Sequence, residues 1–310
     1  MGNSGAARKL TVRDLLNFYE TYRYDVEVQN RPGARAFVIW LYIAKHFLGD
    51  KWIGRNLTPN TGRGFMRLRL DQTVEAEIQA ARLWDLAELL INLQHIDGFD
   101  ELIERMKTAE AESSLAELHV GRLLYINDAQ FKFVVPKMKK KGEDYDLEIT
   151  YPDGLVVCGE TKCKIESTQL TAKTIENALR AARGQLPEDK PGIVFLKFPQ
   201  QWFEGDQKSS AERLMVETAI AFFRGEPPRI PRTTRVVSVK YYVEPLSWAN
   251  GIVGQGHLFK EVSNPHNKFN PTRNWSLFHY RPTTDHWNKL PAKWIRLVNF
   301  PDELGIHGQI

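Results

Sequence analysis

Apolar side chains in the first third of the chain recur at helical spacing. From Val74 to Leu93, leucines and isoleucines are three to five residues apart, which places them along one side of an α-helix. Ala34 to Leu48 is also rich in apolar residues, and Phe99 to Lys107 begins a new apolar pattern after Asp97 and Gly98. We therefore expect residues 1–109 to form a helical region that recognises a substrate or a partner.

The pattern changes from Ser113 onward, where short apolar runs alternate with turn residues. Ser113 or Ser114 is expected to cap a helix that runs to Leu124, with Glu117 in its first turn. The expected strands are Phe131 to Val135, Tyr145 to Tyr151, Leu155 to Cys163, Ile193 to Phe198 and Arg235 to Val243. Two more helices are expected, one capped by Ser167 or Thr168 and reaching Leu186, the other from Ser210 to Phe223. This order predicts an α/β domain over residues 110–245, with a mixed β-sheet flanked by helices.

The last segment, residues 246–310, is rich in Trp, Phe, His, Asn and Pro and shows few clear elements. Its aromatic and basic side chains could stack on the bases of an opened nucleic-acid strand. More often, the aromatic side chains of such a segment fill grooves on the main domain. The residues concerned are His266, Lys268, Arg273, Trp275, His279, Arg281, His286, Lys289, Lys293, Trp294 and Arg296. The histidines lack the spacing of a zinc site.

Composition narrows the class of protein without identifying it. The 310 residues carry a formal charge of +4, which is too small to indicate a polyanionic partner by itself. The only cysteines, Cys158 and Cys163, are five positions apart on one expected strand and face opposite sides, so a disulfide is not expected. The start lacks the apolar core of a signal peptide, and the longest apolar run, Ala36 to Ala44, has nine residues. A cytoplasmic protein without a membrane partner is expected.

Two neighbouring strands combine acidic and basic side chains in a way that indicates chemistry. Alternation places Asp146 on one face of its strand, and Glu160 and Lys162 on one face of the next. If the two strands are antiparallel, the two carboxylates lie side by side, which is unfavourable unless a cation neutralises them. Oxygen ligands favour Mg²⁺ or Mn²⁺. Lys162 could hold a water or offset charge on phosphate oxygens.

These residues resemble the PD-(D/E)xK nuclease superfamily, which has a restriction-endonuclease-like core. The matching residues are Asp146, the run Glu160-Thr161-Lys162, Glu117 on the preceding helix and Gln185 near the end of the following one. The resemblance covers about Ser113 to Val243. It implies that Asp146, Glu160 and the Thr161 carbonyl bind the metal. It also implies that Lys162 assists the attacking water and that Glu117 completes or extends the metal site.

The literal Pro-Asp pair of the motif does not fall on the expected strand. Pro152-Asp153 belongs to the sequence Pro152-Asp153-Gly154, which is typical of a tight turn. Tyr145 stands where the proline would precede Asp146. Asp153 is the alternative candidate if the strand register differs from the one expected.

Nucleic-acid contacts are expected beside this constellation. The candidates are Lys137, Lys139, Lys140, Lys141, Lys173, Arg180 and Arg183, since cations contact phosphates without regard to sequence. The expected function is a Mg²⁺-dependent endonuclease acting on DNA rather than RNA, in restriction, defence or repair. The alternative is a catalytically inactive nuclease-fold subunit that binds nucleic acid within a larger assembly. A homodimer, or a partner chain that supplies ATPase activity, is compatible with either function.

Overall fold

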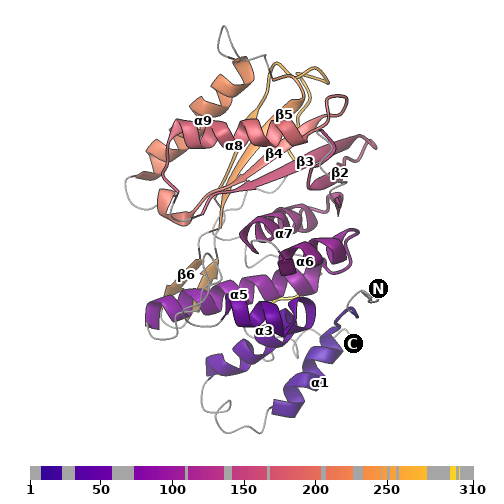
Figure 1. The fold of residues 1–310 in the computed structure, drawn as a ribbon, viewed down its shortest axis with the longest axis vertical. Helices are drawn as coiled ribbons and strands as arrows, with labels where there is room; N and C mark the ends of the chain where they lie inside the picture. Colours follow the sequence, from indigo (N-terminus) through magenta and orange to yellow (C-terminus); the bar gives the residue numbers. More distant parts are fainter. Residues whose placement is uncertain are drawn as a thin grey trace.

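The computed structural model describes residues 8–22, 32–57, 73–108, 111–135, 142–165, 168–203, 207–225, 233–244, 246–249, 252–255, 258–277, 294–297 and 300. The first part of the chain is helical, as the apolar spacing predicts. Its helices are α1 (Val12–Tyr22), α3 (Pro32–Leu48), α4 (Asp50–Asn56), α5 (Thr73–Leu93), α6 (Phe99–Thr108) and α7 (Ala111–Ile126). In Figure 1 they are stacked beneath the sheet, with α7 nearest to it. Helices α1 and α4 were not among the expected elements.

Two predicted helix starts are wrong. Helix α7 begins at Ala111, so Ser114 lies inside it and is buried, and Glu117 falls in its second turn. Helix α8 (Ala172–Gln185) is capped by Thr171, whose hydroxyl accepts a hydrogen bond from the Thr174 N–H at 3.0 Å. Ser167, Thr168 and Thr171 all precede α8, and Ser113 and Ser114 lie in the first turn of α7, so the positions of Ser and Thr alone do not locate either start.

The sheet confirms an α/β fold with a mixed six-stranded sheet in the order β1-β2-β3-β4-β5-β8. The strands are β1 (Gln130–Phe133), β2 (Leu147–Thr150), β3 (Val156–Cys163), β4 (Gly192–Lys197), β5 (Val236–Val243) and β8 (Leu258–Ser263). Strands β1, β2 and β3 are antiparallel neighbours, β3, β4 and β5 are parallel, and β8 is antiparallel to β5. The parallel strands are connected through α8 and through α9 (Gln207–Arg224).

The segment after Pro245 contains more regular structure than its composition predicts. β6 (Leu246–Ala249) and β7 (Ile252–Gln255) form an antiparallel pair, and β8 adds an edge strand to the main sheet. The dipeptide Asn250-Gly251 between β6 and β7 is a hairpin signal in the sequence. The expectation of few elements in this segment was therefore wrong.

Helices cover both faces of the sheet, and each face has its own apolar core. Helices α8 and α9 lie on one face (Figure 1) and pack against Cys158, Val194 and Leu196. The N-terminal helices and α7 pack on the opposite face, where Leu147 and Ile149 are fully buried. Alternation along the strands therefore separates the side chains as expected.

Aromatic residues of the last segment belong to the core. Trp275 and Trp294 are 1% and 4% exposed. The indole N–H of Trp294 donates to Glu88 on α5, and the Tyr151 hydroxyl donates to the Trp275 carbonyl. Of the two roles considered for the tail, these two residues fill grooves on the main body. His279, Arg281, His286, Lys289 and Lys293 lie outside the described residues.

Two further predictions concerned membrane-spanning helices and the two cysteines. No helix in the described ranges is long and apolar enough to cross a membrane. Cys158 and Cys163 are not joined in a disulfide, as expected for residues on one strand.

Candidate functional site

The register between β2 and β3 places Asp146 beside Glu160. Leu147 pairs with Gly159, so Asp146 lies opposite Glu160 one position before β2 begins. The Asp146 N–H donates to the Gly159 carbonyl at 3.0 Å, and its Oδ2 accepts from the Thr161 N–H at 2.7 Å. Opposite residues of an antiparallel pair hold their side chains about 5 Å apart. The two carboxylates are therefore neighbours just before the start of β2, beside the second half of β3.

Lys162 joins this pair to α8. Its Nζ donates to Glu160 Oε1 at 2.5 Å and to Gln185 Oε1. The Gln185 side-chain amide in turn donates to the Asp144 carbonyl at 3.1 Å. Because Gln185 is the last residue of α8, the end of this helix fixes the position of the lysine. Lys162 and Gln185, which the resemblance named separately, are thus in direct contact.

Glu117 approaches the same region from α7 and is paired with an arginine. Its Oε2 accepts from Arg105 Nη2 of α6 at 2.6 Å, and its side chain is 4% exposed. The charge of Asp146 acts on both Glu117 and Glu160 strongly enough to perturb their ionisation. Three carboxylates from α7, from the start of β2 and from β3 therefore share one electrostatic environment.

Burial and mutual repulsion both oppose ionisation of these carboxyls. Burial is the largest influence that raises the pKa of Glu160 well above its ordinary value, and the charge of Asp146 adds to it. The same two causes raise the pKa of Glu117. The pKa of Asp146 is raised by burial, although the Thr161 hydrogen bond and the charge of Lys162 oppose the rise. A site that strains three carboxylates in this way is suited to a bound cation.

The donor atoms at Asp146 and Glu160 suit a hard cation such as Mg²⁺. Glu160 Oε2 is buried and has no hydrogen-bond partner among the described residues. The N–H and C=O groups of one strand residue point to the same side of the strand. The Thr161 N–H donates to Asp146, so the Thr161 carbonyl also faces the side on which Asp146 lies. Two carboxylates and a carbonyl are oxygen ligands of the kind that Mg²⁺ prefers. In the described parts of the chain, Glu117, Asp146 and Glu160 are not a group whose ligand atoms all lie within 4.8 Å of one another.

A different group does meet that distance criterion. Ligand atoms of Asp85, His119 and Glu244 all lie within 4.8 Å of one another, and the three residues are buried, so the group could hold a metal ion. Arg122 binds both carboxylates, at 2.5 Å to Asp85 and 2.8 Å to Glu244. Lys197 Nζ lies 2.7 Å from His119 Nδ1, which leaves the ring proton on Nε2, facing the carboxylates. Two cations already balance the two acids, so we interpret this cluster as a structural ion-pair network.

Among the basic residues expected to contact nucleic acid, those that the structure describes are not gathered at the Asp146 site. Lys137, Lys139, Lys140 and Lys141 lie outside the described residues. On α8, Lys173 and Arg180 both pair with Glu176, and the Arg183 guanidinium lies 5.7 Å from the ring centroid of Phe222. At about 100° of rotation per residue, these three residues lie more than 100° around the helix from Gln185. Their contacts with nucleic acid stay a prediction.

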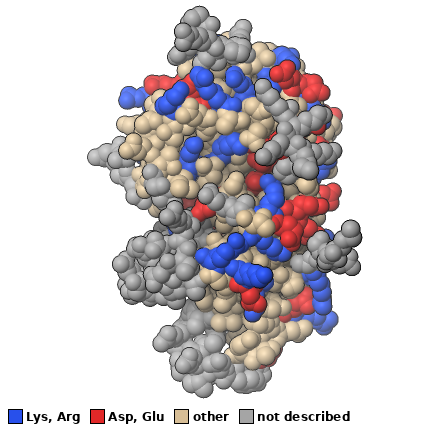
Figure 2. All heavy atoms as spheres, viewed as in Figure 1, with Lys and Arg blue, Asp and Glu red and all other residues tan. Residues whose placement is uncertain are grey.

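Basic side chains also gather elsewhere on the surface. Figure 2 shows Lys and Arg over α5 and α6 on the viewed face, with acidic side chains beside them. Helix α6 is also the element that carries Arg105.

Two residues at the site escaped the sequence analysis. Arg105 lies twelve positions before Glu117, and nothing in that spacing indicates an ion pair between two helices. Asp144 lies two positions before Asp146, and its charge raises the pKa of Asp146 as the weakest of several influences. Because side chains two positions apart on a strand share a face, the spacing of Asp144 and Asp146 could have identified Asp144 as a site residue.

The alternative candidate Asp153 lies in the β2–β3 turn. Its carboxylate forms an exposed pair with Arg273 at 2.6 Å and accepts from the Leu155 N–H. The charge and hydrogen bonds of these partners lower its pKa to about 2. The predicted turn and the predicted register are therefore both confirmed.

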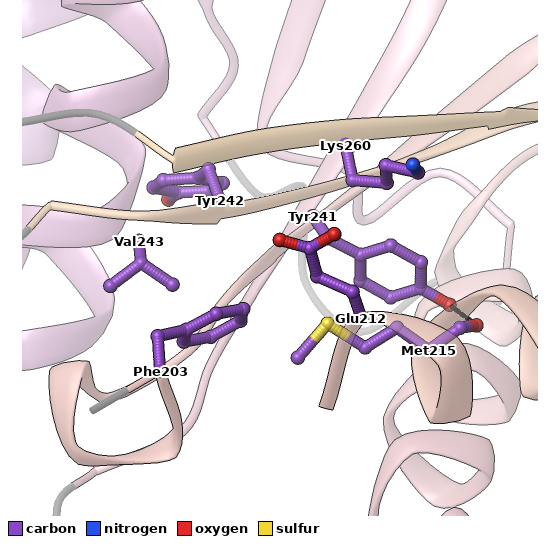
Figure 3. A pocket seen from close by; sticks show the side chains of 7 residues that line it. All are labelled: Phe203, Glu212, Met215, Tyr241, Tyr242, Val243 and Lys260. Atoms are coloured by element: carbon purple, nitrogen blue, oxygen red, sulfur yellow. Dashed lines mark hydrogen bonds between the residues drawn. The ribbon is translucent and has the colours of Figure 1, made fainter. Parts of the chain in front are cut away.

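A separate hollow of about 160 Å³ lies beside β5 (Figure 3). It is lined by Phe203, Glu212, Met215, Tyr241, Tyr242, Val243 and Lys260. The Tyr241 hydroxyl donates to the Met215 carbonyl of α9 at 2.8 Å, so the phenol is already engaged. The hollow shares no lining residue with the Asp146 site.

The fold and the site together define an α/β protein in which buried carboxylates, a lysine and a glutamine gather beside the start of β2 and the end of β3 in a mixed sheet. Comparison with known proteins adds no family to this description. No protein-family model matches the chain, and no curated protein matches it.

Proposed function

We propose that this chain is a Mg²⁺-dependent nuclease with a restriction-endonuclease-like core, and that it hydrolyses phosphodiester bonds in DNA. The observation that carries the proposal is the convergence of four residues. Asp146 and Glu160 are cross-strand neighbours, and Lys162 contacts Glu160 and Gln185 together. All four were expected from the resemblance to PD-(D/E)xK nucleases, and they come from three separate elements of the fold.

In this proposal, Asp146, Glu160 and the Thr161 carbonyl would hold the cation, which would supply Lewis-acid polarisation of the scissile phosphate and a more acidic water. Lys162 has a different task. An ammonium group has three donors and no acceptor, and two of the donors go to Glu160 and Gln185. The third can donate to the attacking water or to a phosphate oxygen, where it offsets the negative charge that builds as the phosphorus is attacked.

Gln185 positions the lysine. Its amide group accepts from Lys162 Nζ and donates to the Asp144 carbonyl, so the glutamine links the lysine to the backbone just before Asp146. Since both contacts use opposite ends of one amide, a change at Gln185 would free the lysine without removing charge.

The proposal is tested by incubating the purified protein with circular, linear and single-stranded DNA and with RNA, with and without Mg²⁺. We expect DNA cleavage only with the metal. Asp146→Asn and Lys162→Met should each reduce the rate by at least about 100-fold, as loss of a charge-stabilising group does in other enzymes. Asp153→Asn is the matched control, because this carboxylate is exposed in the turn. Metal-dependent cleavage that survives Asp146→Asn would refute the proposal.

The same protein can distinguish the alternative, a nuclease-fold subunit that binds nucleic acid without cutting it. Such a subunit would bind DNA in a gel-shift assay but would bind no Mn²⁺ that depends on Asp146 and Glu160. If the protein cleaved RNA and not DNA, the proposed metal-dependent hydrolysis would stand and the substrate would be RNA.

A further inference from the structure

The proposed nuclease chemistry leaves the role of Arg105 open. This residue lies on α6 with 31% of its side chain exposed, and its Nη2 is 2.6 Å from Glu117 Oε2. Its Nε is buried and has no hydrogen-bond partner among the described residues. The guanidinium thus lies at the mouth of the site with one end on a buried carboxylate.

Glu117 requires a cation at this position. It is 3% exposed and lies near enough to Asp146 for the two charges to repel each other. Arg105 supplies that cation, and its charge acts on Asp146 as well as on Glu117. A guanidinium does not lose its proton in proteins, so the compensation is permanent.

The charges at the site can be balanced by one divalent ion. With all three carboxyls ionised, Glu117, Asp146 and Glu160 would carry three negative charges, against two positive ones on Lys162 and Arg105. Asp144 adds a carboxylate at the half-buried rim. With Asp144 counted, one divalent ion between Asp146 and Glu160 brings the four carboxylates and the two cationic side chains to neutrality, and a second ion would leave the set positive. A second divalent ion beside Glu117 would meet the fixed charge of Arg105 at close range.

We propose that Arg105 occupies the place of a second divalent cation beside Glu117, so that the site binds a single metal ion. The inference rests on the proposed metal site. It assigns Arg105 as a positioning residue that holds Glu117, and it assigns Glu117 to the arginine rather than to the metal. Arg105 then presents the remainder of its guanidinium toward solvent, from which a phosphate would approach.

The first test is a titration with Mn²⁺ alone, followed by electron paramagnetic resonance of the free ion. The wild-type protein should bind one Mn²⁺ per chain, and Asp146→Asn should abolish that binding. Arg105→Met should bind two, and Arg105→Lys should bind one because an ammonium still faces Glu117. Lys107→Met is the matched control on the same helix, since Lys107 pairs only with the exposed Glu104 among the described residues. It should bind one.

Glu117→Gln provides a second test if Arg105→Met fails to fold. This variant should still bind one Mn²⁺, whereas a complete loss would show that Glu117 is a ligand of the single ion and would overturn the inference. Two ions in the wild-type protein, or one in a folded Arg105→Met, would also overturn it. If the wild-type protein binds no Mn²⁺, the proposed function itself fails, and the two failures are thereby distinguishable.

Discussion

Individual carboxyl groups at the candidate site are held in an environment that favours their protonated form. Glu160 is fully buried on β3, and the pKa of its carboxyl is raised by burial and by the neighbouring Asp146. Lys162 opposes the rise but does not overcome it. A bound metal ion would stabilise the ionised carboxylate in place of the proton. We therefore expect a rise in pH to lower the stability of the metal-free protein, and metal binding to raise it.

The raised pKa of Glu160 predicts that its contribution to stability depends on pH. Because the pKa of Glu160 is higher in the folded than in the unfolded chain, its contribution is fully present below the ordinary glutamate pKa of about 4.3. The contribution is lost as pH rises through the raised pKa. With chelator present, the Tm of the wild-type protein should fall relative to Glu160→Gln as pH rises. Each 1 kcal/mol lost should lower the Tm by roughly 2 °C.

The measurement is differential scanning calorimetry of both proteins from pH 5 to 9. Comparing the two removes the effects of other groups, such as Asp153, whose pKa is shifted downward. Mn²⁺ should restore the wild-type Tm at high pH and leave Glu160→Gln almost unchanged. A constant Tm difference across this range would contradict the prediction.

At the scale of elements, the turn between α5 and α6 determines where α6 meets the sheet. Gly98 adopts a φ of 81°, and a Cβ atom at this position would lie 2.0 Å from the Phe133 carbonyl oxygen. The Phe133 N–H also donates to the Asp97 carbonyl at 2.8 Å. The close approach therefore holds the start of α6, and with it Arg105, against the edge strand β1.

Gly98→Ala should destabilise the protein by about 2–5 kcal/mol, since it combines backbone strain of about 1–2 kcal/mol with a clash against backbone. Gly154→Ala is the matched control. Gly154 has nearly the same φ, 82°, but nothing lies within 4 Å of the added Cβ, so only the strain should appear. Urea unfolding of the two variants measures the difference, and equal midpoints would show that the close approach has no energetic weight.

At the scale of the whole molecule, a buried network of charged residues joins the helical region to the sheet. Asp85 comes from α5, His119 and Arg122 from α7, Lys197 from the end of β4, and Glu244 follows β5. Burial opposes ionisation of Asp85, but the charge of Arg122 and the hydrogen bond with His119 outweigh it and keep its pKa below the ordinary range. The network therefore ties four elements together with ionised groups.

Arg122→Met should destabilise the protein by about 3–5 kcal/mol, because it leaves two buried carboxylates without their shared cation. Lys107→Met removes an exposed partner of Glu104 and should change stability by less than about 1 kcal/mol. Chemical denaturation with a probe in each region would measure both values. If Arg122→Met were as mild as Lys107→Met, the network would not be needed to join the two regions.

The sequence permitted a correct prediction of the α/β class, of the β2–β3 hairpin and of the pairing between Asp146 and Glu160. Each follows from local physics. Alternation fixes which side chains share a face, and Pro152-Asp153-Gly154 fixes the turn. The helix starts were less accessible, because several Ser and Thr residues stand near each one and the local signal does not choose among them.

The strand β8 was missed for a reason of the same kind at longer range. Its partner, β5, is separated from it by the β6–β7 pair, and hydrogen bonding between distant segments leaves no periodic trace in either one. The contact of Arg105 with Glu117 likewise joins two helices, and only their relative placement brings the two charges within 2.6 Å.

The sequence by itself determined which residues could do chemistry together, since a strand has a period of two and a tight turn reverses it with a defined register. Only the tertiary structure decided how those residues are charged and held. Burial sets the pKa of Glu160, the end of α8 places Gln185 on Lys162, and α6 places Arg105 on Glu117. Electrostatic energies depend on distance and burial in three dimensions, and neither quantity is encoded in local spacing.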